Sequence, residues 1–268
     1  MIEVRDLGRV EYEEALTLQR ELAEARKTGR SGRDLLLLVE HPPVITHGRG
    51  ADPTHTLSDA AGFAAGGIRR VEVERGGDVT YHGPGQVVGY PILHLEGFRK
   101  DLHWYLRRIE EALIRALDGF GIGGFRVEGF TGVWVGDAGL DALGERRREA
   151  LPAGASRPLV ASGEIRKVAS IGVHASRWVT THGFAVNHST RSLDGFRWIV
   201  PCGIPGVTMT SIEDEGVAVE RADVLAALVA GFGEAFRVEM IPADQGPSLA
   251  TAKGRTDRFE HGRSKGLE

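Results

Sequence analysis

The sequence predicts an α/β (α+β) fold, in which helices pack on a mixed β-sheet. Strand-like runs alternate with amphipathic helices, and the run Leu-Leu-Leu-Leu-Val between Asp34 and Glu40 is typical of a strand buried on both faces. Such a strand needs a layer of structure on each side. No internal repeat or linker interrupts the pattern, so residues 1–244 are predicted as one domain and residues 245–268 as a flexible tail.

The first half of the chain alternates between the two periodicities. A short strand over 2–4 precedes an amphipathic helix whose apolar residues recur over 15–25 and which ends near Gly29. The elements predicted next are a strand over 34–40, a strand over 44–49, a loop with a short helix over 52–67, and a strand over 68–74.

The second half is predicted to complete the sheet and its cover. After a strand over 87–95, an apolar stripe at helical spacing predicts a helix over about 100–120, with Gly121 at its C′ position. The stripe consists of Leu102, Leu106, Ile109, Leu113 and Leu117. One strand is expected over 125–136, a solvated surface insertion at about 137–162, strands over 167–176 and 178–188, and a helix over 223–236.

Composition and charge argue against several classes of partner. The 33 basic and 37 acidic residues give a net charge of −4, which offers no general attraction to nucleic acid. No apolar run approaches the roughly 20 residues of a membrane span, and the first twenty residues lack the apolar core of a signal peptide. We therefore expect a cytoplasmic protein without a membrane partner. Cys202 is the only cysteine, which excludes an intramolecular disulfide and any multi-cysteine zinc site.

A glycine-rich stretch from Arg75 to Pro91 interrupts the strand pattern. It contains five glycines and two prolines between two strand-like runs, so backbone geometry and free N–H groups matter more there than side-chain packing. Such a loop either holds a ligand with its main chain or simply makes turns.

Cys202 and Lys167 are the two candidates for chemistry. A lone cysteine is usually a small buried hydrophobe, but this one lies in Val-Pro-Cys-Gly-Ile-Pro-Gly, where proline and glycine fix the backbone and can present the thiol to a cleft. Lys167 opens a strand that is otherwise small and apolar, and at that position it is either a solvated charge or a buried base. A buried amine close to the thiol would favour the thiolate, which is the nucleophile.

The histidines leave a second arrangement open. His82, inside the glycine-rich stretch, is a possible base for a Cys-His pair, whereas the other histidines show no metal-ligand spacing. Gly172, Gly183 and Ala185 either open a channel for an extended apolar ligand or permit close packing of strands.

Four motifs in order resemble the lipoyl(octanoyl) transferases of lipoate biosynthesis. They are Arg75-Gly-Gly-Asp-Val-Thr-Tyr-His-Gly-Pro-Gly-Gln86, Lys167-Val-Ala-Ser-Ile-Gly-Val173, Thr181-His-Gly-Phe-Ala-Val-Asn187 and Val200-Pro-Cys-Gly-Ile204. Glu40-His-Pro-Pro-Val44 and Gly48-Arg49 fit the same family. The chain departs from the family in its longer segment at 137–162 and in His174, where arginine is common.

The resemblance implies a fold shared with biotin protein ligases and lipoate ligases. It also implies transfer of octanoyl from octanoyl-acyl carrier protein to a lysine of the lipoyl domains of 2-oxoacid dehydrogenase complexes and of the glycine cleavage H protein. No metal or cofactor of its own is implied, because the donor carries phosphopantetheine.

Carried over, Cys202 is the nucleophile and acyl-thioester site, and Lys167 is the residue that activates it. The residues implied to line the acyl pocket are Arg75, Gly76, Gly77, Asp78, Val79, Thr80, Tyr81, His82, Ser170, Ile171, Gly172, Gly183, Phe184 and Ala185. Backbone N–H groups near Gly76 and Gly77, or around Ser170 to Gly172, are candidates to hold the oxyanion.

Three alternatives remain from the residues themselves. An ATP-dependent lipoate or biotin ligase on the same fold would activate its acid as an adenylate and would not need Cys202. A catalytically silent acyl- or lipoyl-binding protein would show no covalent adduct, and a Cys-His hydrolase would release free octanoate and depend on His82.

Overall fold

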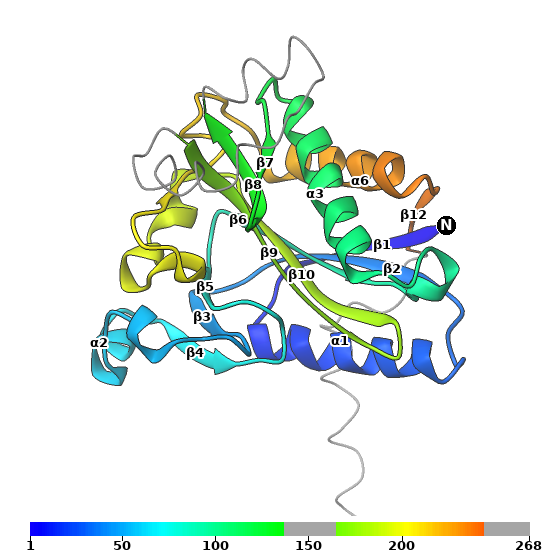
Figure 1. The fold of residues 1–268 in the computed structure, drawn as a ribbon, viewed down its shortest axis with the longest axis horizontal. Coiled ribbons are helices and arrows are strands. Elements are labelled where there is room, and N and C mark those ends of the chain that lie inside the picture. The colour runs from blue at the N-terminus through cyan, green and yellow to red at the C-terminus, as the bar shows by residue number, and fades with distance from the viewer. Residues whose placement is uncertain (137–164, 244–268) are drawn as a thin grey trace, which may run out of the picture.

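The computed structural model describes residues 1–136 and 165–243, and there the predicted mixed sheet with packed helices is confirmed (Figure 1). Its strands are β1 (Ile2–Arg9), β2 (Asp34–Glu40), β3 (Val44–His47), β4 (Arg69–Glu72), β5 (Val79–His82), β6 (Gln86–Ile92), β7 (Phe125–Val127), β8 (Phe130–Gly136), β9 (Ile165–Ser176), β10 (Val179–Asn187), β11 (Thr208–Met209) and β12 (Met240–Pro242). Its helices are α1 (Tyr12–Lys27), α2 (Ala60–Ala65), α3 (Leu102–Asp118) and α6 (Arg221–Phe236).

The larger sheet has the order β12-β1-β2-β6-β10-β9-β8-β7, with β11 beside β9. Strands β12, β1 and β2 pair in parallel, and the neighbours from β2 to β7 along that order are antiparallel. A smaller sheet of order β4-β3-β5 lies beside it with α2 (Figure 1). Between them, the two sheets carry both motifs that the sequence marks as functional, β5 with the glycine-rich stretch and β9 with Lys167.

Helices cover both faces of the larger sheet, as the apolar run of β2 predicts. Leu36 and Leu38 pack with residues of α3 and α6, whereas Leu35, Leu37 and Val39 face α1. Figure 1 shows the same layers, with α3 and α6 on one side of the sheet and α1 on the other. All five side chains are nearly inaccessible to solvent, and the strand contributes to the core on both faces of the sheet.

The apolar stripe of α3 is only partly buried in the core. Asp101 caps the helix by accepting a hydrogen bond from the Trp104 N–H (3.0 Å), and Ile109, Leu113 and Leu117 are buried as predicted. Leu102, however, is 41% exposed. The first turn of the stripe therefore does not enter the core.

Two of these elements differ from the sequence prediction. Helix α3 ends at Asp118 with Gly119 as its cap, so Gly121, with φ +73°, lies two residues beyond that cap and not at C′. The single strand expected over 125–136 is a hairpin, β7 and β8, turned at Gly129 with φ +80°. In both cases the predicted periodicity was extended through a turn that contains glycine.

The glycine-rich stretch contains a strand that its composition conceals. Residues 79–82 form β5, which pairs antiparallel with β3. The predictions for 137–162 and 245–268 lie outside the described residues. Among the described helices, none is long and apolar enough to cross a membrane.

Gly231 provides a test of the α3–α6 contact. A Cβ at this position of α6 would collide with the Ala112 carbonyl of α3, so the two helices approach as closely as backbones allow. We expect Gly231→Ala to lower the free energy of unfolding by about 1–3 kcal/mol, although alanine is the better helix former. Urea denaturation measures this. The exposed neighbour Ala230→Leu should change it by less than about 0.5 kcal/mol, and equal stability of all three proteins would contradict the close contact.

Candidate active site

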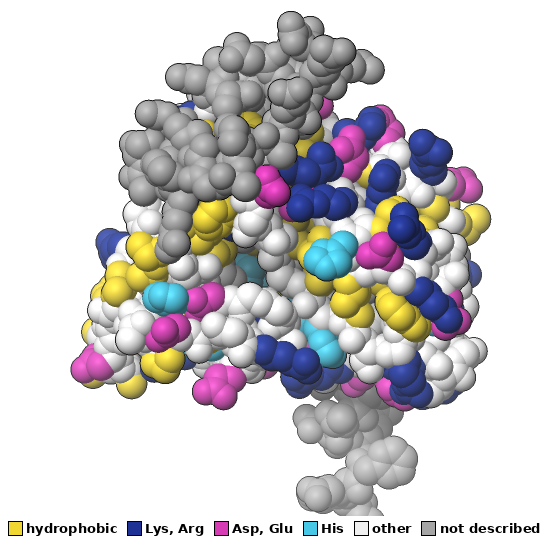
Figure 2. Space-filling view, in the orientation of Figure 1, with side chains coloured by type: hydrophobic (Ala, Val, Ile, Leu, Met, Phe, Trp, Pro, Cys, Tyr) yellow, Lys and Arg dark blue, Asp and Glu magenta, His cyan; other side chains and the backbone are white. Residues whose placement is uncertain are grey.

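A pocket of about 640 Å³ opens where one edge of β9 loses its partner strand. The register of β8 on β9 runs from Ile165 to Ala169, and beyond it the loop Arg75–Asp78 covers the edge, with the Gly76 N–H donating to the Val173 carbonyl (2.9 Å). The pocket thus lies beside this edge of the strand, and its lining residues come from both faces of the sheet. Figure 2 shows the molecular face hollowed near its centre, with histidine and hydrophobic side chains around the hollow.

The pocket contains nearly every residue that the sequence proposed for the site. Cys202, Lys167, Arg75–Thr80, His82, Ser170–Gly172 and Gly183–Ala185 line it. Tyr81 is the exception. Side chains alternate along β5, so Tyr81 points away from the pocket between Thr80 and His82 and packs edge-on against Phe196.

Cys202 projects from a strained turn. It lies in a short 3₁₀ segment, Pro201–Gly203, with φ +57° and ψ +19°, a left-handed conformation that is uncommon for residues other than glycine. Gly203 also has a positive φ, and a Cβ there would collide with Asp78, so the turn and the glycine-rich loop fit closely. Strain of this kind costs about 1–3 kcal/mol and persists where the surroundings fix the side chain.

The terminal nitrogen of Lys167 lies next to the Cys202 thiol in the protein interior. Lys167 is the third residue of β9, is 1% exposed, and its Nζ lies 3.3 Å from Cys202 Sγ. The same Nζ lies 5.1 Å from the centre of the Trp134 ring, which closes its other side. The solvated alternative for this lysine is therefore wrong.

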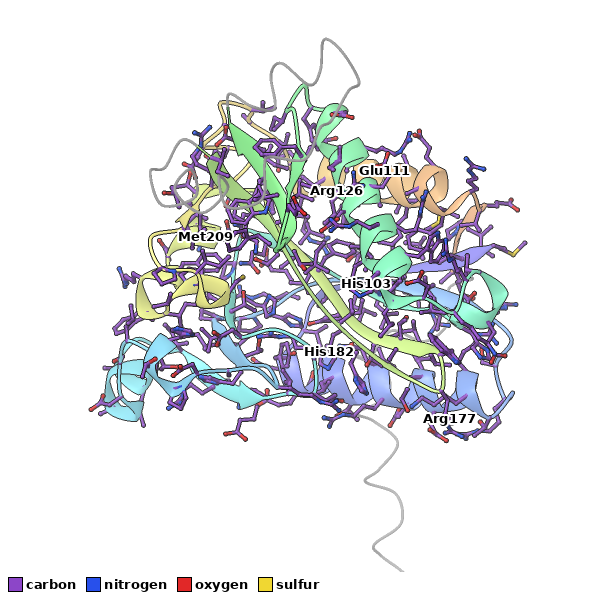
Figure 3. All side chains as sticks on the ribbon, viewed as in Figure 1. His103, Glu111, Arg126, Arg177, His182 and Met209 are labelled. Carbon is purple, nitrogen blue, oxygen red and sulfur yellow. The ribbon has the colours of Figure 1, made fainter. Side chains whose placement is uncertain are left out.

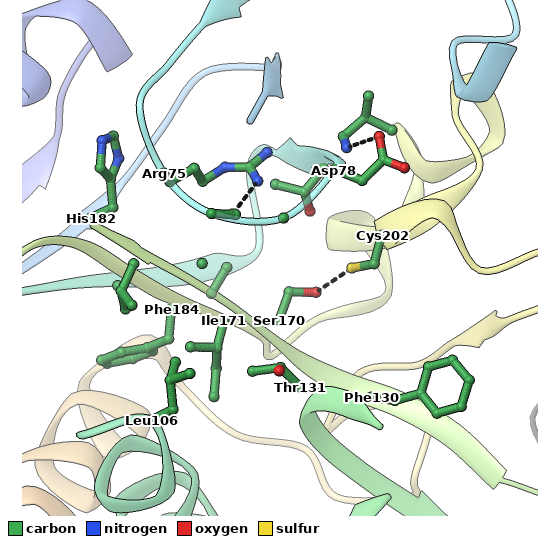
Figure 4. Close-up of a pocket in the computed structure, with 18 of the residues that line it drawn as sticks. Arg75, Asp78, Leu106, Phe130, Thr131, Ser170, Ile171, His182, Phe184 and Cys202 are labelled. Carbon is green, nitrogen blue, oxygen red and sulfur yellow. Dashed lines mark hydrogen bonds between the residues drawn. The ribbon is translucent and has the colours of Figure 1, made fainter. Parts of the chain in front are cut away.

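Gly132 makes room for the lysine. Its φ is +133°, and a Cβ there would lie 2.6 Å from Lys167 Cε. Ser170 adds a third polar group, with Oγ 3.8 Å from Cys202 Sγ (Figure 4). Among the described residues, these amine and hydroxyl groups are the ones within hydrogen-bonding range of the thiol.

His82 does not form the alternative pair with Cys202. Its Nδ1 lies 3.2 Å from Gln86 Oε1, and its ring stacks on Tyr12 and lies edge-on to His41. Burial lowers the pKa of His82 to about 3, so the ring is neutral at physiological pH. The histidine belongs to a buried aromatic cluster beside the pocket.

Arg75 and Asp78 hold the glycine-rich loop in place. The Arg75 guanidinium donates to the Thr46 carbonyl (2.7 Å) and hydroxyl (2.9 Å) and to the Gly76 carbonyl (3.2 Å), and burial lowers its pKa. The Asp78 carboxylate accepts from the N–H groups of Asp52 and Val79 and pairs with His55. No carboxylate forms a salt bridge with Arg75 in the described part of the chain. The positive charge of the Arg75 guanidinium therefore contributes to the electrostatic potential of the pocket.

The small residues serve packing more than channel width. A Cβ at Gly183 would collide with the Gly89 carbonyl of β6, and one at Gly172 would lie 3.0 Å from Arg75 Cδ. The close-packing alternative is confirmed for Gly183, and at Gly172 the covering group is the arginine side chain. Both residues nevertheless border the pocket.

Sequence patterns missed part of the lining. Tyr12 and Tyr90 on the α1 side, and Leu102, His103, Leu106 and Phe130 on the α3 side, also line the pocket. The sequence did contain an indication for Leu102 and Leu106. A helical stripe that extends beyond the core has apolar residues available to line a pocket. No group of three or more His, Cys, Asp or Glu suited to hold a metal ion occurs within 1–136 and 165–243.

Comparison with known proteins identifies the class to which this fold and pocket belong. Residues 11–233 match the family model of the lipoyl protein ligase A/B catalytic domain, and the chain belongs to this family, as its motifs predict. A protein of Gloeobacter violaceus named octanoyltransferase is 42% identical over 248 residues, covering 92% of this chain and 96% of that protein. A Myxococcus xanthus octanoyltransferase is 42% identical over 258 residues, which are 95% of this chain and 66% of that protein.

A solved structure supports the fold independently. The bipartite lipoate protein ligase of Thermoplasma acidophilum, described with its E2 lipoyl domain, superimposes with a TM-score of 0.63 at 16% identity. The match covers 91% of this chain and 89% of that one. The expected likeness to lipoate ligases is confirmed at the level of fold.

The buried histidines predict a loss of stability in acid. Burial lowers the pKa of His41 to about 4, of His82 to about 3 and of His182 to about 4. Unfolding exposes them to water, where the ordinary value is about 6.5, so the unfolded chain binds more protons below that pH. Stability is therefore full above about pH 6.5 and falls as the pH drops toward 4, by about 2 kcal/mol per histidine at pH 5.

Urea unfolding at pH 7 and pH 5 measures this difference. His82→Gln should reduce it by about 2 kcal/mol, because glutamine does not titrate. His103→Gln, on the exposed side of α3 (Figure 3), should leave it unchanged. A His82 variant with the full pH dependence of the parent would contradict the neutral buried ring.

Proposed function

We propose that this protein transfers an octanoyl group from octanoyl-acyl carrier protein to a lysine of a lipoyl domain through a thioester on Cys202. The 3.3 Å contact between the buried Lys167 Nζ and Cys202 Sγ carries the proposal. The names of the relatives support the octanoyl group, and the acceptor follows the lipoate ligase architecture. The reaction transfers an acyl group from the thiol of the donor to the amine of the target lysine, and it needs no ATP and no resident cofactor.

In the first step, Cys202 attacks the donor. Lys167, as the neutral amine, accepts the thiol proton, and the thiolate sulfur bonds to the carbonyl carbon of the donor thioester. The tetrahedral intermediate collapses with loss of the phosphopantetheine thiolate, which takes up the proton that Lys167 holds. One thioester replaces another, so the step is nearly balanced in free energy.

The loop over the β9 edge supplies the groups for the oxyanion. The Gly76 N–H already donates to Val173, so it is unsuited to this role, and Gly77, with φ +86°, has no protein acceptor for its N–H among the described residues. We assign the oxyanion to the Gly77 N–H, assisted by the Ser170 hydroxyl and the buried charge of Arg75. Each such donor typically contributes a few kcal/mol to the transition state.

In the second step, the target lysine opens the thioester. Its neutral amine attacks the acyl carbon, the Cys202 thiolate leaves, and the proton released by the attacking nitrogen returns to the thiolate through Lys167. An amide replaces a thioester, which makes the transfer favourable. The pocket also extends to the apolar side chains at the start of α3, which leaves room for the arm of either partner protein.

The surface near the pocket suits an acidic carrier protein. Lys and Arg side chains gather over α3 beside the hollow (Figure 2), and Arg126 lies there (Figure 3). Arg107 belongs to α3, and its carbonyl accepts a hydrogen bond from Arg126. Glu110 and Glu111 pair with them and offset part of this charge. An electrostatic attraction at this surface is compatible with the net charge of −4, because a carrier protein interacts mainly with the charges nearest to it.

The covalent intermediate is directly testable. We expect incubation with octanoyl-acyl carrier protein, without ATP, to add one octanoyl group to the tryptic peptide that contains Cys202, and Cys202→Ala to abolish both the adduct and transfer to a lipoyl domain. Mass spectrometry of the quenched protein measures the adduct, and its tryptic digest locates it. Transfer that requires ATP and free octanoate would instead indicate a ligase, release of octanoate a hydrolase, and donor binding without an adduct a silent binding protein.

Lys167→Met tests the base while filling the same buried space. We expect acylation of Cys202 to slow by about 100-fold or more, because the thiol loses its proton acceptor, while donor binding persists. Lys100→Met is the matched control, since that lysine is exposed and pairs with Glu96. An unchanged acylation rate in Lys167→Met would rule out the assigned role.

A further inference from the structure

A histidine that the two transfer steps do not use lines the pocket on the side away from Cys202 (Figure 4). His182 lines the pocket and is 1% exposed, and neither ring nitrogen has a hydrogen-bond partner among the described residues. Its φ is +57°, a left-handed value that is rare for such a side chain within a strand. A buried polar ring held at a strained backbone position indicates that its direction matters.

The strain moves the side chain to the other face of the sheet. His182 and Phe184 are two residues apart on β10 and would share a face in a regular strand. Figure 4 instead shows His182 on the Arg75 side of the strand and Phe184 on the Leu106 side. The imidazole therefore lies on the same side of the sheet as the glycine-rich loop. The backbone N–H of His182 donates to Gln19 Oε1 of α1 (2.8 Å).

Ion-paired groups stand behind the ring. His182 Nε2 lies 3.7 Å from Glu74 Oε2, and the Arg20 guanidinium donates to both oxygens of that carboxylate (3.1 and 2.9 Å). An apolar chain that continued past the imidazole would meet this pair and desolvate it, which is costly. The ring and the ion pair together form a polar boundary on this side of the pocket.

The position of this boundary matches the length of an eight-carbon chain. Cys202 Sγ lies beside Ser170, which pairs with Ala185, and three residues farther along the strands Val173 pairs with His182. At about 3.4 Å per residue, the thiol and the histidine are about 10 Å apart along the strands. An extended eight-carbon chain, with C–C bonds of about 1.5 Å, advances about 9 Å.

We propose that His182 is the end wall that sets acyl-chain length: a chain attached to Cys202 runs along the Arg75 side of β9 and β10 and stops at the imidazole after eight carbons. The inference rests on the octanoyl transfer proposed above and adds the residue that selects the chain. The strained backbone, the change of face and the ion pair behind the ring all follow from this role.

The test is a competition between donors on the full-length protein. Equimolar octanoyl- and decanoyl-acyl carrier protein are mixed with the enzyme, and quenched intact-mass spectrometry gives the ratio of decanoyl to octanoyl adducts on Cys202. The wild-type protein should favour octanoyl. His182→Ala should raise the ratio about 15-fold, because two more methylene groups become buried and each contributes about fourfold.

Two further variants separate chain length from folding and from the other side of the pocket. His182→Asn is shorter than histidine but tolerates the left-handed backbone, so it should shift the ratio in the same direction without added strain. Leu106→Ala, on the Phe184 side, should leave the ratio where it was. Folding of each variant is checked by thermal unfolding.

The outcomes are distinct. Folded His182 variants with the wild-type ratio would overturn the proposal, and a shift in Leu106→Ala alone would place the chain on the α3 side of the sheet. A wild-type protein that forms no adduct with any donor would refute the transfer mechanism itself, and with it this assignment. A shift in both His182 variants and none in Leu106→Ala is the expected result.

Discussion

The contact between Lys167 and Cys202 is the constraint around which the site is arranged. An amine buried in the middle of a sheet is unfavourable unless a partner compensates its lost hydration. Here the compensation comes from the thiol on one side and the face of Trp134 on the other. The left-handed backbone of Cys202 and the missing side chain of Gly132 are the two local costs that make the approach possible.

The early end of the β8 pairing has an equally large effect. A β9 paired with β8 along its whole length would present a continuous sheet, whereas the end of that pairing at Ala169 allows one cavity to reach both faces of the sheet. The two faces differ in chemistry. On the α1 side Tyr12, Arg75 and His82 form a polar and aromatic wall, and on the α3 side Leu106 and Phe130 form an apolar one. Cys202 therefore lies in a cavity whose two sides differ in polarity.

Much of the scaffold was predictable because it depends on short-range patterning. The β2 run and the helical stripes of α3 and α6 have strong periodicity, and the buried residues are largely those that the periodicity marks. The errors fall where glycine changes the chain direction, as in the β7–β8 hairpin, or where strand residues sit among glycines, as in β5. The site residues were found through motifs, and Tyr81 was misplaced because a motif does not say which face of a strand each member occupies.

Composition and the order of residues along the chain were sufficient to predict the fold class and the family, and they marked Cys202 and Lys167 as candidates for the chemistry. They could not decide that Lys167 is buried, because its environment comes from Trp134 and from Cys202, 35 residues later in the chain. Nor could they decide between Lys167 and His82 as the partner of the thiol, or place His182 on the pocket side of β10. These outcomes depend on strand register and on two strained backbone positions, which only long-range packing can enforce.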